Sequence, residues 1–156
     1  MPHSRSLRTG RVSTEGQVYL CSTVTQHRQE LFKDWRIGRL VIAPLRWLDQ
    51  NEYTTTFAYV VMPDHCHWLF ALGDGKRLSD VMAAMKKQSA RLVNQALGTN
   101  GPIWQSGFHD HALRNDELTQ RVAWYVINNP IRSGLVEDIG RYPLWDARWL
   151  CENPEV

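Results

Sequence analysis

The sequence predicts an α+β domain in which an antiparallel sheet carries helices, because strand-like and helix-like patterns alternate along its 156 residues. Runs rich in β-branched and aromatic residues, bounded by turn residues, predict strands at 17–25, 53–62, 65–72 and 108–113. Apolar residues at helical spacing predict helices within 31–48, 78–97 and 116–130. The resulting order, β-α-β-β-α-β-α, is that of a split β-α-β domain of the ferredoxin-like or RRM-like kind.

The two middle strands are expected to form a hairpin. Residues 57–62 are apolar on both faces, as in a central strand, and Pro63 and Asp64 then turn the chain. Residues 65–72 therefore return antiparallel to the preceding strand and end at Gly73. Helices are expected on one face of this sheet, with the other face open or covered by an added helix.

The first two helical segments differ in how clearly the sequence predicts a continuous helix. In 78–97, Ser79 or a neighbour is the expected cap and Gly98 is the expected stop. In the earlier segment the helix is expected over the middle and end, and Gly38 and Pro44 weaken the pattern for a continuous helix.

The last helical segment is DELTQRVAWYVINNP at 116–130. Asp116 and Glu117 suit its start by capping and by charge, and Pro130 lies just beyond the expected end. The residues from 131 onward contain Gly, Pro and aromatic side chains, so we expect them to pack irregularly across the domain.

Length and composition predict one domain with a sizeable core. The chain is 43% apolar and contains seven tryptophans, and it shows no repeat, low-complexity tract or linker. We expect a basic N-terminal arm at 1–14, a single domain at 15–150 and a short tail at 151–156. Three widely spaced cysteines without a CxxC pair, and the absence of a long apolar run, predict a soluble protein of a reducing cytoplasm.

Charge by itself does not indicate nucleic-acid binding, because the net charge is only +2. The basic residues are nevertheless skewed, with fourteen Arg and four Lys. Arginine presents a planar fork that suits phosphate groups and guanine edges. A genome rich in G and C would produce the same bias, so the skew is compatible with both interpretations.

The most informative motif is His65-Cys66-His67 in the predicted strand 65–72. Successive side chains of a strand point to opposite faces, so both imidazoles project from one face, one pleat apart. Two imidazoles on a rigid strand can form half of a metal site. Strand histidines that bond only to backbone or water would give the same pattern, so the motif alone leaves both interpretations open.

A second motif lies in the last predicted helix. Tyr125 and Asn129 are four residues apart, which places them one above the other on one helical face. A phenol and a carboxamide oxygen one turn apart can serve as nucleophile and metal ligand. Tyr125 also continues an apolar stripe, and a tyrosine in such a stripe is commonly part of the core.

Taken together, three segments of the chain resemble the REP-associated tyrosine transposases, relatives of the single-tyrosine insertion-sequence transposases of the HUH superfamily. The segments are MPDHCHWLF at 62–70, IWQSGFHDHALR at 103–114 and WYVINNPIRSGLV at 124–136. They occur in the order and at about the spacing seen in that family, and the resemblance covers roughly residues 15–150. It implies the HUH endonuclease fold.

The resemblance also implies a chemistry. His65 and His67 match the paired metal-binding histidines, Tyr125 matches the nucleophile, and Asn129 matches the residue that completes the metal site. It implies a metal-dependent endonuclease and strand transferase, using Mg²⁺ or Mn²⁺, that acts on single-stranded or hairpin DNA of the REP type. Its intermediate would be a 5′-phosphotyrosine. His111 matches a recurrent family position and would support the site or pack.

Basic residues outside the motifs are the predicted DNA contacts. They are Arg5, Arg8 and Arg11 of the arm, Lys86, Lys87 and Arg91 of the second helical segment, and Arg114. A charged helix face is also typical of ordinary solvent-exposed surface.

Two other functions remain open from the sequence. One is a structural zinc domain in which two His-x-His pairs, His65 with His67 and His109 with His111, form a tetrahedral site. The other is a hairpin-binding protein of the same fold that does not cleave. For the oligomeric state we expect a monomer rather than a dimer, because the tail can complete one subunit.

Overall fold

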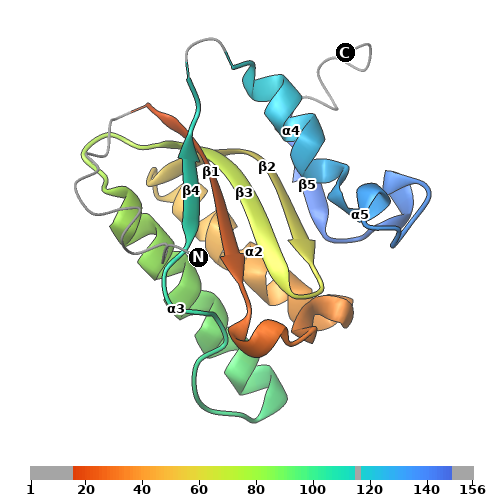
Figure 1. The fold of residues 1–156 in the computed structure, drawn as a ribbon. Helices are drawn as coiled ribbons and strands as arrows, with labels where there is room; N and C mark the ends of the chain where they lie inside the picture. The colour runs from red at the N-terminus through yellow and green to blue at the C-terminus, as the bar shows by residue number, and fades with distance from the viewer. Residues whose placement is uncertain (1–15, 115–116, 149–156) are drawn as a thin grey trace.

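In the computed structural model, which describes residues 16–114 and 117–148, the chain folds around one antiparallel sheet (Figure 1). The order of the five strands across it is β4-β1-β3-β2-β5, and every neighbouring pair is antiparallel. The strands are β1 (Val18–Val24), β2 (Thr54–Met62), β3 (His65–Leu72), β4 (His109–Ala112) and β5 (Trp145–Ala147).

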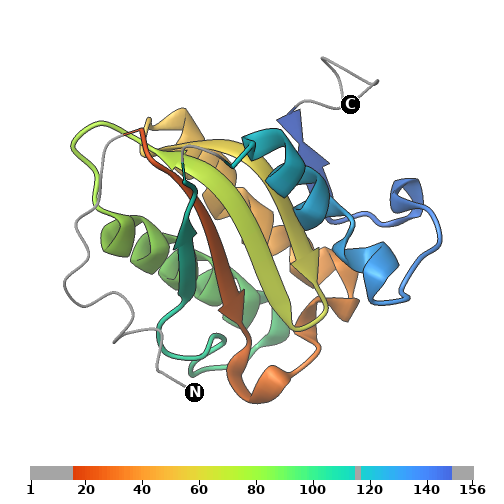
Figure 2. The same ribbon diagram turned by 45° about the horizontal axis from the view of Figure 1, so that its top comes forward.

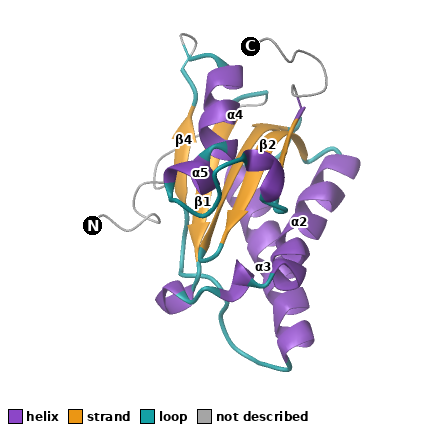
Figure 3. Ribbon diagram, turned by 90° about the vertical axis from the view of Figure 1, so that its right-hand side faces the viewer, coloured by secondary structure: helices purple, strands orange, loops and turns teal. Residues whose placement is uncertain are grey.

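Helices cover both faces of the sheet (Figures 2 and 3). On one face lie α2 (Trp35–Gln50) and α3 (Leu78–Leu97), and on the other lie α4 (Thr119–Ile127) and the single turn α5 (Asn129–Arg132). Three short 3-10 turns complete the described chain: η1 (Gln26–Arg28), η2 (Leu31–Lys33) and η3 (Ile139–Arg141).

The alternation of side chains along the strands divides the apolar residues into two cores. In β3, Trp68 and Phe70 belong to the core beneath α2 and α3, whereas Leu69 belongs to the core beneath α4. His65 and His67 share the parity of Leu69, so they project from the α4 face. Of the two expected arrangements, the sheet face that carries the histidines is therefore the one covered by an added helix, α4.

Strand register determines which side chains can meet at the site. In the β1–β3 ladder Ser22 is opposite His67, and in the β1–β4 ladder Ser22 is also opposite His109. Residues directly opposite each other in a ladder share a face. The row His67, Ser22, His109 therefore lies on the α4 face, with a strand between the two imidazoles.

The predicted elements are largely confirmed, including β3 and α3 at their predicted bounds. Helix α2 runs through Gly38 and Pro44 without interruption, so the expected weakness there was wrong. The C-terminal segment is more regular than predicted, because β5 pairs with β2 and extends the sheet. This pairing joins residues 145–147 to a strand more than 80 residues earlier, so it cannot be predicted from the local sequence pattern of 131–148.

The predicted helix starts were wrong in detail. The cap of α3 is Arg77, not Ser79, and the cap of α4 is Leu118; neither cap makes a side-chain hydrogen bond. Pro130 lies inside α5 rather than beyond the last helix, because proline is tolerated in a first helical turn. Asp116 falls outside the described residues. Within the described ranges no helix is long and apolar enough to span a bilayer.

Candidate active site

The two imidazoles of β3 lie side by side on the α4 face of the sheet. The ring centroids of His65 and His67 are 4.8 Å apart and the ring planes meet at 77°. His65 Nδ1 lies 2.6 Å from Asp64 Oδ1, and His67 Nδ1 lies 2.6 Å from Ser22 Oγ. Among the described residues neither Nε2 atom has a hydrogen-bond partner. The pair thus presents two free ring nitrogens, with each ring held in place through the other nitrogen.

Burial of the His67 ring keeps it neutral. Burial of the His67 ring, with smaller contributions from His65 and Arg132, lowers the pKa of His67 to about 4. Since a metal ion binds the neutral form of imidazole, this ring is ready to act as a ligand at neutral pH. The surroundings of His67 therefore favour the neutral imidazole, which can bind a metal ion, over the protonated form.

The partner of His65 is a carboxylate. Burial by itself would raise the pKa of Asp64, but the hydrogen bond with His65 and the charges of His65 and Arg28 lower it below the ordinary value. Arg28 Nη1 lies 3.3 Å from Asp64 Oδ2 on the other side of the carboxyl group. A carboxylate that accepts from the Nδ1–H of an imidazole fixes its orientation and raises its basicity as a ligand.

Tyr125 lies on α4 with 57% of its surface exposed, so it is not part of the core. Its helix is anchored instead by Ala123, Val126 and Ile127, which are buried against the sheet. The guanidinium carbon of Arg132 lies 4.0 Å from the centroid of the Tyr125 ring. The phenol is therefore a surface group on the helix that covers the face bearing the histidines.

Asn129 does not continue the helix of Tyr125, because α4 ends at Ile127 and α5 begins at Asn129. Its Nδ2 donates to the carbonyl oxygens of Val126 at 3.0 Å and Tyr125 at 3.3 Å. The amide nitrogen is thus used in closing the end of α4. The remaining group, Oδ1, is an oxygen donor of the kind that divalent cations accept.

The donor set of the site fits a divalent ion. His65 and His67 offer imidazole nitrogens, and Asn129 offers an amide oxygen. Imidazole suits Mn²⁺, and an amide carbonyl suits both Mg²⁺ and Mn²⁺. Three ligands of this kind also leave room for oxygens from a substrate.

His111 and Arg114 meet a common partner, Glu117. The Nε2 atom of His111 lies 2.9 and 3.1 Å from the two carboxylate oxygens of Glu117. The backbone N–H of Arg114 donates to the same carboxylate at 2.9 Å, and its Nε lies 3.4 Å away. This cluster links the end of β4 to the start of α4, so His111 supports the helix that carries Tyr125.

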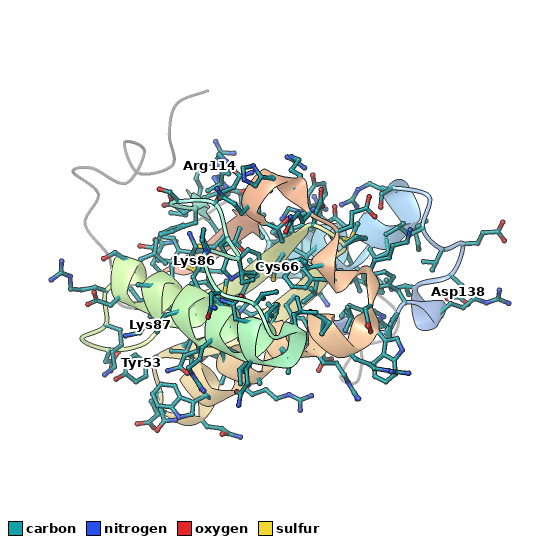
Figure 4. The ribbon with its side chains drawn as sticks, turned by 90° about the horizontal axis from the view of Figure 1, so that it is seen from below. Tyr53, Cys66, Lys86, Lys87, Arg114 and Asp138 are labelled. Carbon is teal, nitrogen blue, oxygen red and sulfur yellow. The ribbon has the colours of Figure 1, made fainter. Side chains whose placement is uncertain are left out.

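The other predicted DNA contacts do not share the face of the histidines. Lys86, Lys87 and Arg91 are on α3, beneath the opposite face of the sheet. Lys86 Nζ donates to the carbonyl oxygens of Gln105 and Gly107 at 2.6 Å each, which ties α3 to the loop before β4. Viewed from below, Arg114 lies at the upper edge of the molecule and Lys87 lies lower, beside α3 (Figure 4). Arg5, Arg8 and Arg11 lie outside the described residues.

The four-histidine zinc site is not formed. The strands of the two His-x-His pairs, β3 and β4, lie on either side of β1, which separates their backbones by about 10 Å at the usual strand spacing. His111 is also bound to Glu117. In the part of the chain that the structure describes, no three His, Cys, Asp or Glu side chains come together as a metal site.

Sequence reasoning missed three residues that contact the candidate site residues. Asp64 could have been noticed as the neighbour of His65, and Arg132 lies seven residues after Tyr125, about two helical turns along. Ser22 could not have been found, because its contact with His67 depends on the register of two strands 45 residues apart.

Comparison with known proteins defines the class of this fold and site. A family model described as "Transposase IS200 like" matches residues 14–129, a range that holds both histidines, Tyr125 and Asn129. The chain belongs to this family.

Two curated relatives are similar to this chain. The REP-associated tyrosine transposase of Escherichia coli K12 is 29% identical over 86 residues, which cover 55% of this chain and only 50% of that relative. A putative REP-associated tyrosine transposase of Haemophilus influenzae is 25% identical over 140 residues, covering 83% of this chain and 79% of the relative. The chain thus spans half the length of the first relative and most of the second.

Solved structures support the same fold. The structure of a REP-associated tyrosine transposase bound to a REP hairpin superposes with a TM-score of 0.67 at 24% identity, covering 86% of this chain and 79% of that one. A putative transposase from Deinococcus radiodurans superposes with a TM-score of 0.55 at 21% identity, over 76% of this chain and 95% of that one.

Proposed function

We propose that this chain cleaves and rejoins single-stranded DNA beside a REP-type hairpin, using Tyr125 as the nucleophile. One observation carries the proposal. Tyr125 is exposed on α4, and this helix packs on the sheet face from which His65 and His67 project with unbonded Nε2 atoms. Membership of the IS200-like transposase family supports the same assignment.

We assign His65, His67 and Asn129 as ligands of a divalent ion, Mg²⁺ or Mn²⁺. Such an ion, when bound, supplies positive charge to the scissile phosphate. The residues themselves orient the site: Asp64 and Ser22 hold the two rings, and the Asn129 amide closes the end of α4 while leaving its oxygen available.

The covalent step is a transesterification. The Oη atom of Tyr125 attacks phosphorus, a phosphotyrosine bond forms, and the bond from phosphorus to the 3′ oxygen breaks. The phenol loses its proton to solvent, and the departing 3′ oxygen takes up a proton to become a hydroxyl group. The phosphodiester energy is conserved in the protein–DNA bond, so a later attack by a 3′-OH joins strands without a nucleotide cofactor.

Single-stranded DNA next to a hairpin is the proposed substrate. A scissile phosphate in a single strand can enter the site without distorting a duplex, and its unpaired bases are free for recognition. A relative of the same fold has been solved with a REP hairpin bound. We propose that the chain acts as a monomer, since its C-terminal segment completes its own sheet as β5.

The test is covalent trapping with a 3′-end-labelled hairpin substrate in Mn²⁺ or Mg²⁺. The unmodified protein should shift the label on a denaturing gel, and chelation should abolish the shift. Tyr125→Phe should bind the hairpin without forming the adduct. Tyr53→Phe, a half-buried tyrosine whose ring contacts Trp47 and Lys76, serves as the control and should react normally.

Two results would overturn the proposal. An undiminished adduct with Tyr125→Phe would place the nucleophile elsewhere. Tight hairpin binding by the unmodified protein, with no cleavage in either metal, would favour the alternative of a DNA-binding protein without the cleavage reaction.

A further inference from the structure

Arg132, at the end of α5, packs against the proposed nucleophile. Its guanidinium carbon is 4.0 Å from the centroid of the Tyr125 ring, and its Nη2 donates to the Tyr125 carbonyl oxygen at 2.5 Å. One cation thus contacts the proposed nucleophile both at its ring and at its backbone carbonyl oxygen.

The charge of Arg132 is not neutralised by the protein. Arg132 is exposed, and among the described residues no carboxylate forms an ion pair with it. Of its five N–H donors, the structure uses one on the Tyr125 carbonyl. The remaining donors are therefore available to an anion that approaches Tyr125.

We propose that Arg132 is a catalytic residue of this site: it stacks on Tyr125 to orient the phenol and donates hydrogen bonds to a non-bridging oxygen of the scissile phosphate. This inference rests on the proposed function. A phosphorus atom under attack by Tyr125 must lie beside the Tyr125 ring, where the free N–H groups of Arg132 are. Charge that develops on the phosphate oxygens is stabilised most by donors already held in place.

The structure explains why arginine is required here. The planar guanidinium can stack on an aromatic ring and still direct N–H groups outward in its own plane. An ammonium group at the same position would keep the charge and N–H donors, but it offers neither planar stacking on the ring nor a fixed fork of donors in one plane. Lysine is therefore expected to restore only part of the function.

The experiment measures the single-turnover rate of adduct formation with saturating 3′-end-labelled hairpin DNA and Mn²⁺, together with hairpin affinity. Arg132→Gln should lower the rate at saturation by about 100-fold or more, the usual effect of removing one preorganised donor. Arg132→Lys should lower it on the order of tenfold, because lysine supplies neither the planar stacking nor the fork of donors. Hairpin affinity should fall far less than the rate.

Two controls separate this role from general charge and from folding. Arg141→Gln removes one exposed positive charge from η3 and should leave the saturated rate unchanged. Arg132→Ala should recover rate when guanidinium ion is added at millimolar concentration, without a change in hairpin affinity. A residue that only supported α5 would show no such rescue.

The inference fails if Arg132→Gln reacts at the unmodified rate, if its defect lies in affinity alone, or if guanidinium gives no rescue of a folded Arg132→Ala. Each of these results leaves the proposed function standing as long as Tyr125→Phe forms no adduct. An adduct with Tyr125→Phe would instead overturn the proposed function itself.

Discussion

The hydroxyl group of Ser22 illustrates how much of this site depends on single contacts. Its oxygen lies 2.6 Å from His67 Nδ1, and no other hydrogen bond to that ring is found within the described chain. A neighbour of this kind fixes the orientation of an imidazole that binds metal through its other nitrogen.

We predict that Ser22→Ala weakens Mn²⁺ binding by about 10- to 100-fold, the usual cost of removing such a partner. Titration calorimetry with Mn²⁺ alone measures it, and Ser22→Thr, which retains the hydroxyl, should bind nearly normally. His109→Gln is the matched control, because His109 is opposite Ser22 on the other neighbouring strand. Unchanged affinity in Ser22→Ala would contradict the prediction, and weakened affinity in His109→Gln would show that His109 also contributes to Mn²⁺ binding.

At the scale of elements, α2 shows how a weak helical pattern can be overridden by packing. Gly38 lies in its interior, where glycine ordinarily costs about 1 kcal/mol relative to alanine. A Cβ atom at this position would lie 2.4 Å from Leu144 Cδ1, and Leu144 is itself buried. The glycine thus allows the C-terminal segment to pack against α2.

We predict that Gly38→Ala destabilises the protein by about 1–3 kcal/mol, the range for overpacking a core, although helix propensity favours alanine. Urea denaturation measures the change. In a Leu144→Ala background, where the side chain in the way is absent, the same substitution should become neutral or stabilising. A stabilising effect of Gly38→Ala in the unmodified protein would show that Leu144 moves aside freely.

The segment that leads into β5 is secured by Tyr142, whose hydroxyl donates to the Val61 carbonyl oxygen at 2.6 Å. Burial, together with the nearby Cys66 thiol, raises the pKa of Tyr142 to about 12 from 10.0. Between these values the unfolded chain loses a proton that the folded chain keeps. The contribution of Tyr142 to stability is therefore complete below pH 10 and is lost as the pH rises from 10 toward 12.

We predict that Tyr142→Phe lowers the free energy of unfolding at pH 8, by about 1 kcal/mol for the missing hydrogen bond. Its stability should then fall less than that of the unmodified protein between about pH 9 and pH 11.5, as measured by chemical denaturation at each pH. Parallel pH profiles for the two proteins would contradict this assignment.

At the scale of the whole molecule, the two sheet faces have different roles. The face under α2 and α3 holds the larger core, whereas the face under α4 carries the imidazole pair and the exposed Tyr125 (Figure 3). DNA held at the histidines must reach around an edge of the sheet to meet α3.

Lys87 and Arg91 remain predicted phosphate-binding residues, since both are exposed on α3. We predict that replacing both by Gln reduces the slope of log affinity against log salt for hairpin binding by about 0.7–0.9 for each phosphate that the variant no longer neutralises. Lys86 is left intact, because it holds the loop before β4. An unchanged slope would mean that the hairpin does not reach α3.

Much of this fold could be predicted from short-range patterns in the sequence. The period-two pattern of β3 placed His65 and His67 on one face, and the helical period of 78–97 located α3 at its bounds. Such patterns succeed because the face to which a side chain points is a property of the local backbone. The motifs around His65 and Tyr125 likewise indicated the family that the comparisons confirm.

The sequence by itself determined the class of fold, the pairing of the two imidazoles and the family. Only the tertiary structure decided that Tyr125 is exposed rather than buried, that Ser22 contacts His67 and Arg132 contacts Tyr125, that Lys86 is engaged in the fold, and that the C-terminal segment adds a strand. The physical reason is the range of the interactions. Strand register, the packing of α4 on the sheet and the turn between α4 and α5 arise from contacts between distant segments, which no local period encodes.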